Sequence, residues 1–311
     1  MKVSRLTDDF IMPNSTALAL GNFDGVHCGH QRLIKDMISW AREHSLESAV
    51  VTFQPHPTEV INPHAAPELL TGEGLKKNLI ENLEPDYLVE IPFTPDFATM
   101  SPETFVEEVL VGQLLVKGLF VGYNYTFGAG GRGDAQLLKQ LGKIHEFSVN
   151  VLPAVSVGND VASSSLIREL LMAGKVGEAN RLLGHAYIIR GAVVEGEKMG
   201  RQLGFPTANL SLEVPSLLPP GVYAVWARGN DLHLPGVMNI GYCPTFGRRN
   251  ISVEVHILDF HGNIYGSMLE VDVRHRLRSE RTFAGVHQLI EQINQDCAEV
   301  RIMLNKDFSR E

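Results

Sequence analysis

The sequence predicts an α/β protein with two domains: a Rossmann-like domain with a parallel sheet, followed by a small antiparallel β-barrel domain with a C-terminal helix. Three observations predict this fold class. Apolar runs alternate with helical patterns from about residue 17 to residue 184, closely spaced strand patterns follow, and one amphipathic pattern ends the chain. Alternating strands and helices are typical of a parallel sheet covered on both faces. We therefore expect domains at residues 1–184 and 185–311.

In the first domain, each expected strand is a short apolar run and each expected helix carries its apolar residues on one face. The expected strands cover residues 17–20, 48–53, 87–91 and 119–125. The expected helices cover residues 30–44, 74–83, 102–113 and 135–143. Ligands of such sheets bind at the carboxyl ends of the strands, where the order of the strands reverses.

In the second domain, strand patterns follow one another without helices between them, which favours a small antiparallel barrel. Apolar residues recur with period two at Ile251, Val253, Val255 and Ile257. The expected strands cover residues 186–195, 221–227, 237–241, 251–260 and 268–276. The final helix is expected to pack on the barrel through one apolar stripe. That stripe consists of Val286, Leu289, Ile290, Ile293, Cys297, Val300 and Leu304.

The composition excludes several classes of protein. Of 311 residues, 44% are hydrophobic and 20% are charged, so the chain is too apolar to be disordered throughout. A net charge of −9 disfavours a bulk electrostatic nucleic-acid binder, and we expect no nucleic-acid partner. No run reaches the roughly 18 apolar residues of a membrane-spanning helix, so we expect no membrane partner.

The cysteines and the N-terminal residues favour a cytoplasmic protein. Cys28, Cys243 and Cys297 are odd in number and far apart, which implies no disulfide framework and fits a reducing compartment. The first residues lack the apolar segment of a signal peptide. The sequence makes no prediction about the oligomeric state.

A glycine-rich turn, residues 21–31, lies between the first expected strand and the first expected helix. Its glycines let the backbone bend and approach a ligand, and the start of a helix offers N–H groups and partial positive charge to a phosphate. His27 and His30 can donate hydrogen bonds to phosphate oxygens. A zinc cluster that includes Cys28 is one alternative, although no further ligands follow at finger-like spacing. A structural role for either histidine is the other.

Three hydroxyls and an arginine form another candidate phosphate site. Ser163, Ser164 and Ser165 open an expected helix, and the guanidinium of Arg168 can bind two phosphate oxygens in a fork. An ordinary serine-capped helix with a solvated arginine explains the same residues.

Residues 128–133 fit the pattern Gly-x-Gly-x-x-Gly but do not predict a dinucleotide site. Such a site needs an acidic residue about 20 positions later, and residues 147–159 contain none. An NAD enzyme is therefore disfavoured, and we interpret the segment as a mobile substrate loop.

The second domain carries its own glycine-rich segment, residues 196–209. It contains no Gly-x-x-x-x-Gly-Lys, so a P-loop kinase is not indicated. Gly196 and Gly200 could admit phosphates close to the backbone. Thr207 and Asn209 share one face of an extended chain, and their neutral oxygens suit Mg²⁺. A plain glycine-rich hairpin is the alternative.

Several of these motifs resemble those of one enzyme family. Residues 21–30 resemble the His-x-Gly-His signature of nucleotidyltransferases, and residues 52–57, 121–128 and 163–168 resemble further segments of the bacterial bifunctional riboflavin kinase/FAD synthetases. Residues 200–209, 220–225, 239–246 and 253–256 resemble the riboflavin kinase signature. The motifs occur in the family's order over essentially the whole chain.

The resemblance implies roles for individual residues. In the first domain it implies catalytic roles for His27 and His30. Nucleotide contacts are implied for Gly21, Phe23, Asp24, Gly29, Ser164, Ser165 and Arg168, and flavin contacts for Pro55, His56, Pro57 and Asn124. In the second domain it implies phosphate contacts for Gly196, Gly200 and Arg201, metal contacts for Thr207 and Asn209, a flavin contact for Arg278 and a catalytic base at Glu254.

The resemblance also implies two reactions, with riboflavin, FMN, FAD and ATP as ligands and Mg²⁺ as cofactor. The second domain would transfer the γ-phosphoryl group of ATP to riboflavin, giving FMN. The first would join FMN to the AMP part of ATP, giving FAD and pyrophosphate. One alternative is a protein with a single active half and a flavin-binding regulatory module. Another is a flavin sensor without activity that binds RNA or protein through its barrel.

Overall fold

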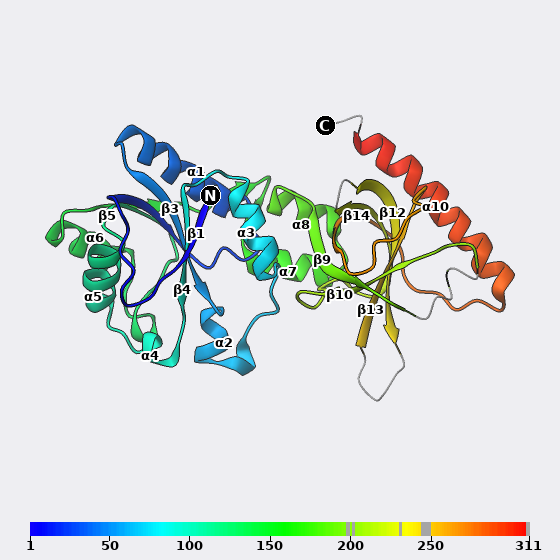
Figure 1. Cartoon of the computed structure of the whole chain (residues 1–311), viewed down its shortest axis with the longest axis horizontal. Helices are drawn as coiled ribbons and strands as arrows, with labels where there is room; N and C mark the ends of the chain where they lie inside the picture. The colour runs from blue at the N-terminus through cyan, green and yellow to red at the C-terminus, as the bar shows by residue number, and fades with distance from the viewer. Residues whose placement is uncertain (197–199, 201–202, 230–231, 244–249, 309–311) are drawn as a thin grey trace. The chain divides into compact units, whose positions relative to one another are not determined.

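The computed structural model describes residues 1–196, 200, 203–229, 232–243 and 250–308. The described chain divides into two compact units (Figure 1). The first unit comprises Met1–Pro67 and Gly74–Ala162, and the second comprises Glu68–Glu73 and Ser163–Glu311. The domain boundary at residue 184 stays a prediction. The segment from 163 to 184, placed in the first domain by the sequence pattern, falls within the second compact unit.

The first unit contains a parallel sheet, which confirms the predicted architecture. Among the described residues it has six strands in the order β1-β4-β3-β2-β5-β6, and every pair of neighbours is parallel. The central strand β2 is buried along its whole length. The strands are β1 (Lys2–Arg5), β2 (Thr16–Leu20), β3 (Glu47–Gln54), β4 (Tyr87–Pro92), β5 (Val116–Gly122) and β6 (Ser148–Leu152). A small hairpin of β7 (Ser156–Val157) and β8 (Asp160–Val161) follows.

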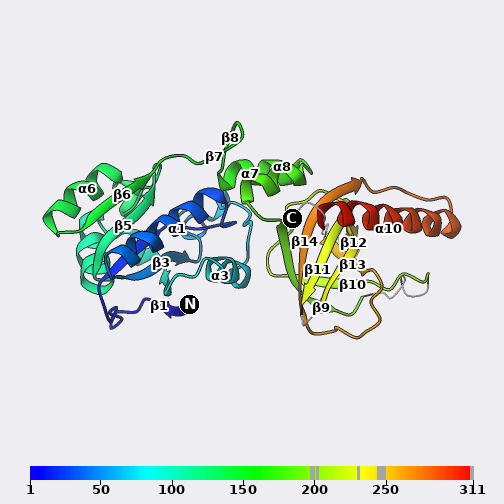
Figure 2. The ribbon, with the colours of Figure 1, turned by 90° about the horizontal axis from the view of Figure 1, so that it is seen from above.

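Helices cover both faces of this sheet (Figure 2). Side chains of β2 alternate between the faces: Ala17 and Ala19 pack with residues of α1, while Leu18 and Leu20 pack with residues of η2 and α6. The helices are α1 (Cys28–Glu43), α2 (Pro57–Ile61), α3 (Glu73–Glu81), α4 (Pro95–Ala98), α5 (Pro102–Thr104), the π-helix η2 (Phe105–Gln113) and α6 (Ala135–Ile144). Short 3₁₀ turns, η1 (Pro63–Ala65) and η3 (Ala129–Gly131), complete the unit.

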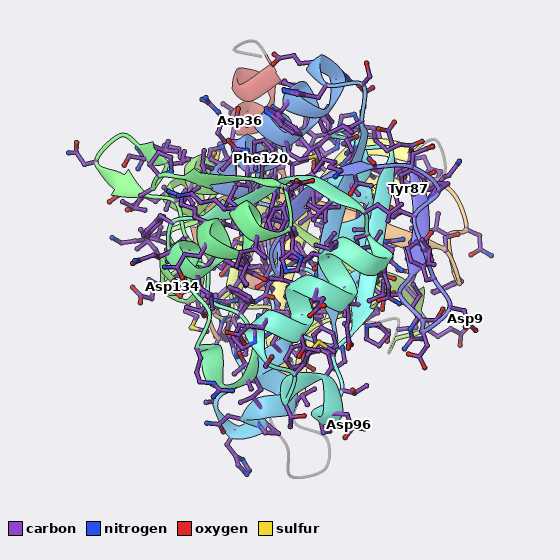
Figure 3. All side chains as sticks on the ribbon, turned by 90° about the vertical axis from the view of Figure 1, so that its left-hand side faces the viewer. Asp9, Asp36, Tyr87, Asp96, Phe120 and Asp134 are labelled. Atoms are coloured by element: carbon purple, nitrogen blue, oxygen red, sulfur yellow. The ribbon has the colours of Figure 1, made fainter. Side chains whose placement is uncertain are left out.

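Acidic side chains of the first unit lie on its surface. Asp9, Asp36, Asp96 and Asp134 lie at its periphery (Figure 3), whereas Phe120 and Tyr87 are each only 6% exposed. The charges are therefore on the surface and the aromatic rings belong to the core, as the composition of a globular domain requires.

The predicted elements of the first unit are present, with some differences. The expected strand at residues 119–125 begins and ends three residues earlier, at Val116–Gly122. The expected helix at 102–113 begins as α5 and continues as η2. The strands β1 and β6 were not predicted. Both lie at the edges of the sheet, and β1 is mostly exposed, so neither has the continuous apolar pattern of a central strand.

The second unit contains a closed antiparallel barrel, as predicted. Its described strands follow the order β10-β13-β12-β11-β14-β9. They are β9 (Tyr187–Val194), β10 (Ala208–Leu212), β11 (Gly221–Gly229), β12 (Leu232–Cys243), β13 (Asn250–Ile257) and β14 (Met268–Arg278). Val253, Val255 and Ile257 are buried at 2%, 0% and 6% exposure, which confirms the alternation for these residues of β13. For Ile251 the prediction was wrong, because this residue is 40% exposed.

Helix α10 (Val286–Phe308) runs along the outside of the barrel (Figure 2). Val300 and Leu304 pack against Val222 and Val237, so the predicted packing of this helix is confirmed for its C-terminal half. For Val286 the prediction was wrong, because its side chain is 56% exposed. The apolar stripe thus extends beyond the part of the helix that packs on the barrel. No helix within the described residues is both long enough and apolar enough to cross a membrane.

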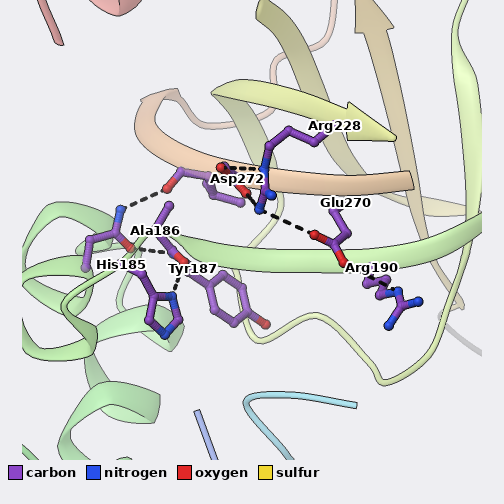
Figure 4. Close-up of polar contacts among 9 residues, drawn as sticks. His185, Ala186, Tyr187, Arg190, Arg228, Glu270 and Asp272 are labelled. Atoms are coloured by element: carbon purple, nitrogen blue, oxygen red, sulfur yellow. Dashed lines mark hydrogen bonds and ion pairs between the residues drawn. The ribbon is translucent and has the colours of Figure 1, made fainter. Parts of the chain in front are cut away.

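Two further helices, α7 (Ser164–Met172) and α8 (Val176–Leu183), belong to the second unit. The amide of Asn180 on α8 joins them to the barrel. Its Nδ2 donates to the carbonyl of Val273 at 2.9 Å and its Oδ1 accepts from the N–H of Tyr187 at 2.8 Å. Beside this contact Arg228 forms a bidentate ion pair with Asp272 (Figure 4).

Candidate active sites

The first candidate site lies at the point where the strand order reverses. From β2 the chain proceeds to β3 and β4 on one side of the sheet, and from β5 to β6 on the other. Because β2, β3 and β5 are parallel, the segments that follow them all leave the sheet at the carboxyl ends of its strands. His27, His56 and Asn124, which the sequence predicted as site residues, therefore all lie at this carboxyl end of the sheet.

His27 caps the N-terminus of α1. Its Nδ1 accepts hydrogen bonds from the backbone N–H groups of Gly29, at 3.1 Å, and of His30, at 3.4 Å. Since Nδ1 is an acceptor, the neutral ring carries its proton on Nε2 and presents a donor there. A Cβ at position 29 would lie 3.0 Å from the His27 ring, so glycine lets the helix begin this close to the imidazole.

His27 and His30 form a stacked pair. Their ring centroids are 3.6 Å apart with 19° between the planes, and the ring of Phe23 meets His30 edge-on at 5.2 Å. Burial, together with the charges of His27 and Lys76, lowers the pKa of His30 well below its usual value of 6.5. His30 is therefore neutral near pH 7. Its Nδ1 is buried and has no hydrogen-bond partner among the described residues.

The turn before α1 has an unusual backbone. Phe23, Gly25 and Val26 have φ angles of 50°, 80° and 40°, a region that residues other than glycine seldom adopt. Phe23 is fully buried and Asp24 is 2% exposed. Gly21 lies against the Phe23 ring, which would be 3.3 Å from a Cβ at that position. The buried phenyl ring thus holds a strained turn next to the two histidines.

The segment after β3 is joined to this turn. The side-chain amide of Asn22 lies 3.2 Å from Nε2 of His56, and Thr52 donates from Oγ1 to the carbonyl of Asn22 at 3.2 Å. His56 also caps α2, which starts at Pro57, by accepting from the N–H of Thr58. The structure therefore brings the predicted flavin residues Pro55, His56 and Pro57 beside the predicted nucleotide residues.

Asn124 follows β5 at the same edge of the sheet. It is exposed, whereas the ring of the next residue, Tyr125, is stacked on Phe127 with centroids 6.1 Å apart. The Tyr125 hydroxyl is buried without a hydrogen-bond partner among the described residues, and burial raises its pKa. The segment that starts at Gly128 includes η3 and is fastened by a backbone bridge between Phe127 and Gly133. The predicted substrate loop therefore has defined local structure.

Ser164, Ser165 and Arg168 lie on α7, in the second unit. Ser163 caps this helix by accepting from the N–H of Leu166 at 3.3 Å, as the serine-cap alternative predicted. Arg168 donates from Nε to the carbonyl of Glu68 at 2.7 Å. A phosphate role for these residues stays a prediction.

The second candidate site is a row of side chains across the barrel. Asn209 of β10 is paired with Glu254 of β13, and Glu254 is paired with Asn239 of β12. The row continues through Val222 of β11 to Arg278 of β14. Paired residues in antiparallel strands place their side chains on the same face. The barrel thus aligns three predicted site residues that lie far apart in the sequence.

Thr207 and two glycines complete this site. Thr207 donates from Oγ1 to Oε2 of Glu254 at 3.1 Å. A Cβ at Gly196 would lie 2.2–2.6 Å from the Asn209 amide, and one at Gly200 would lie 3.4 Å from Thr207 Oγ1. Both glycines therefore approach the oxygens that were predicted to bind metal. Arg201 lies outside the described residues.

The oxygens at this site fit Mg²⁺. Thr207, Asn209 and Glu254 offer a hydroxyl, an amide and a carboxylate oxygen, the kinds of ligand that Mg²⁺ prefers. Among the described residues, no group of three or more His, Cys, Asp or Glu side chains is arranged to hold a metal. The zinc alternative at Cys28 therefore gains no support.

Arg278 has a protein partner. It forms a bidentate ion pair with Asp296 of α10, with Nη2 to Oδ2 at 2.8 Å and Nε to Oδ1 at 3.1 Å. Its guanidinium also lies 5.9 Å from the centre of the Phe283 ring. Arg278, the predicted flavin contact, is thus held in position by its ion pair with Asp296.

Three residues near these sites were missed by the sequence reasoning. Lys76 is buried on the inner face of α3 between Leu75 and Ile80, and a charge on that face of the helical pattern was a detectable signal. Asn239 and Asp296 owe their positions to strand pairing and to a tertiary ion pair. Local sequence patterns give no signal for either.

Comparisons with known proteins show the family of the chain. A family model for FAD synthetase matches residues 11–166, and one for riboflavin kinase matches residues 183–304. The chain belongs to the family of bifunctional riboflavin kinase/FMN adenylyltransferases. The predicted family is confirmed, and the chain is an enzyme with both catalytic domains of that family. The alternative of a single active half gains no support.

Individual relatives are similar along almost their whole length. The family member from Bacillus subtilis is 39% identical over 288 residues, 90% of each chain. The member from Escherichia coli K12 is 37% identical over 280 residues, also 90% of each. A crystal structure described as a macrolide-efflux protein from Streptococcus pneumoniae has a TM-score of 0.88 at 29% identity, covering 97% of this chain and 99% of that one.

Proposed function

We propose that riboflavin is phosphorylated to FMN at the row of side chains that contains Glu254. We propose that FMN is joined to AMP at the site that contains His27 and His30. The observation that carries this proposal is the grouping of the motif residues. Thr207 and Glu254 are 47 positions apart and yet hydrogen-bonded, while the stacked histidines lie at the switch point of the parallel sheet. Each group has the chemistry that one of the two reactions needs.

In the kinase reaction, Glu254 acts as the general base. The terminal hydroxyl of riboflavin must lose a proton as its oxygen attacks the γ-phosphorus of ATP, and a positioned carboxylate accepts that proton. Gly196, Gly200 and Arg201 contact the phosphates, and Arg278 contacts the flavin. Thr207 and Asn209 would hold Mg²⁺, which when bound supplies positive charge to the phosphates.

In the adenylyl transfer, no strong base is needed, because the phosphate of FMN is already an anionic nucleophile. The Nε2–H of His27, neutral His30 and the N-terminus of α1 stabilise negative charge on the α-phosphate and the leaving pyrophosphate. Gly21, Phe23, Asp24 and Gly29 form the nucleotide side of the site. The flavin side consists of Pro55, His56, Pro57 and Asn124, and Ser164, Ser165 and Arg168 are proposed as further phosphate ligands.

The proposal assigns residues 1–184 to adenylyl transfer and residues 185–311 to the kinase. It places both reactions in the cytoplasm, a reducing compartment, which is consistent with Cys28 and Cys297 forming no disulfide among the described residues. It requires riboflavin, FMN, FAD and ATP as ligands, and neither a nucleic acid nor a membrane.

Chromatography of the flavin products tests the proposal. With ATP and Mg²⁺, riboflavin should be converted first to FMN with release of ADP and then to FAD. With FMN as the starting flavin, FAD and pyrophosphate should form without ADP. An enzyme that leaves both flavins unchanged under these conditions would refute it.

A further inference from the structure

A buried ion pair joins the last residue of β14 to helix α10. Arg278 and Asp296 have side chains that are 13% and 3% exposed. Both carboxylate oxygens of Asp296 accept from Arg278, and Oδ1 also accepts from Nε2 of Gln292 at 2.9 Å. Such a bidentate, desolvated pair has one geometry and therefore fixes the two backbones relative to each other.

Residues 279–285, here called the bridging loop, connect these two elements. The loop is fastened at several points to the ion pair and to α10. Arg281 donates to Oε1 of Gln292, the side chain that binds Asp296. Phe283 lies against the Arg278 guanidinium, and the N–H of Ala284 donates to Gln288 at 3.2 Å. The conformation of the loop therefore depends on the ion pair.

The bridging loop borders the row that contains Glu254. A Cβ built on Gly241 would lie 2.7 Å from Oε1 of Glu280 and 3.5 Å from Nδ2 of Asn239. Asn239 is the strand partner of Glu254. The loop thus places the Glu280 side chain over Gly241, two residues from Asn239 along β12. The bridging loop therefore approaches β12 two residues from the strand partner of the proposed base.

We propose that Asp296 is a positioning residue for the phosphorylation of riboflavin. It holds Arg278 and the bridging loop beside the place where the flavin alcohol must lie to reach Glu254. Asp296 itself is buried and touches no substrate. The inference rests on the proposed function of the Glu254 row, and it predicts that loss of the Asp296 charge weakens the binding of riboflavin more than it slows the chemical step.

A second bidentate ion pair between α10 and the barrel provides a control. Arg301, further along α10, forms a bidentate pair with Asp259 at 2.6 and 2.9 Å. This pair also joins α10 to the barrel, but it is largely exposed and lies outside the bridging loop. If fastening α10 were all that mattered, loss of either carboxylate charge would have a similar effect.

Steady-state kinetics of Asp296→Asn and Asp259→Asn in the full-length enzyme test the proposal. For Asp296→Asn, we expect the KM for riboflavin to rise about tenfold, equivalent to about 1.4 kcal/mol. The kcat for phosphorylation and the KM for ATP should change by less than about threefold, which is below 0.7 kcal/mol. The rate of FAD formation from supplied FMN should be unchanged. Asp259→Asn should leave all four quantities at the wild-type values.

An unchanged riboflavin KM in Asp296→Asn would overturn the proposal, and so would an equal rise in Asp259→Asn. If Asp296→Asn also loses FAD formation through misfolding, Gln292→Leu provides the test, because it removes one hydrogen bond to Asp296 and leaves the ion pair. It should raise the riboflavin KM about threefold, and no rise would overturn the proposal. A wild-type enzyme that does not phosphorylate riboflavin would instead refute the proposed function.

Discussion

The imidazole of His30 owes its chemistry to its surroundings. A free histidine titrates near pH 6.5, but burial and the neighbouring charges of His27 and Lys76 disfavour the protonated form. The neutral ring can donate a hydrogen bond to a phosphate, and it stacks on His27 without charge repulsion. The buried Lys76 thus contributes to the protonation state of His30, which the sequence identified only by its motif.

The depressed pKa predicts a direction of pH dependence. Just below pH 6.5 the unfolded chain binds a proton at His30 and the folded chain does not, so the His30 contribution to stability falls as the pH falls. The free energy of unfolding of wild type minus that of His30→Ala should therefore decrease from pH 7.5 to pH 5.5. Urea unfolding measures this difference. A constant difference, or a His30 proton resonance that titrates at pH 6.5 or above, would contradict the assignment.

At the scale of elements, the N-terminal cap of helix α1 is His27, which is also a proposed site residue. Replacement of the cap by alanine removes the acceptor for two N–H groups and should cost about 1 kcal/mol of stability. His27→Asn retains a cap and should be closer to wild type in urea unfolding. Both variants lose the Nε2 donor, so both should lose about 100-fold or more in adenylyl transfer. Equal stability of the two variants would contradict the capping role, and full activity of His27→Asn would contradict the catalytic one.

The glycine-rich segment before β10 makes a similar prediction for the kinase. In Gly196→Ala the new methyl group would lie 2.2–2.6 Å from the Asn209 amide and must displace it. Riboflavin phosphorylation should fall at least about tenfold, equivalent to about 1.4 kcal/mol in the barrier, while FAD formation from FMN persists. Gly177→Ala, where a Cβ meets nothing within 4 Å, is the control and should retain both rates. If Gly196→Ala phosphorylated riboflavin at the wild-type rate, the proposed role of Gly196 in the kinase site would be contradicted.

The elements also show what the sequence could and could not predict. Buried central strands such as β2 and β3 consist of apolar runs, and these runs predicted them from the sequence. The edge strand β1 is exposed and largely polar, so it was missed. Strand β10 was missed because it has only five residues, of which three are partly or fully exposed. Thr207, Asn209 and Glu254 were found by motif. Their alignment with Asn239 and Arg278 depends on barrel register, which no local pattern encodes.

At the scale of the whole molecule, the chain carries two chemistries on two compact units. The central residues of each candidate site lie within one unit: the stacked histidines in the parallel-sheet unit, and the row of Asn209, Glu254 and Asn239 in the barrel unit. The central claim is therefore that the two activities can be removed separately. A protein in which both depended on one shared site would not behave in this way.

The most direct test measures flavin products of Glu254→Gln and His30→Ala, each supplied with either riboflavin or FMN, ATP and Mg²⁺. Glu254→Gln should slow formation of FMN by about 100-fold to 10,000-fold, the usual contribution of a general base, and still convert supplied FMN to FAD. His30→Ala should accumulate FMN from riboflavin and form little FAD. If either substitution removed both activities from a folded enzyme, the account of two independent sites would be contradicted.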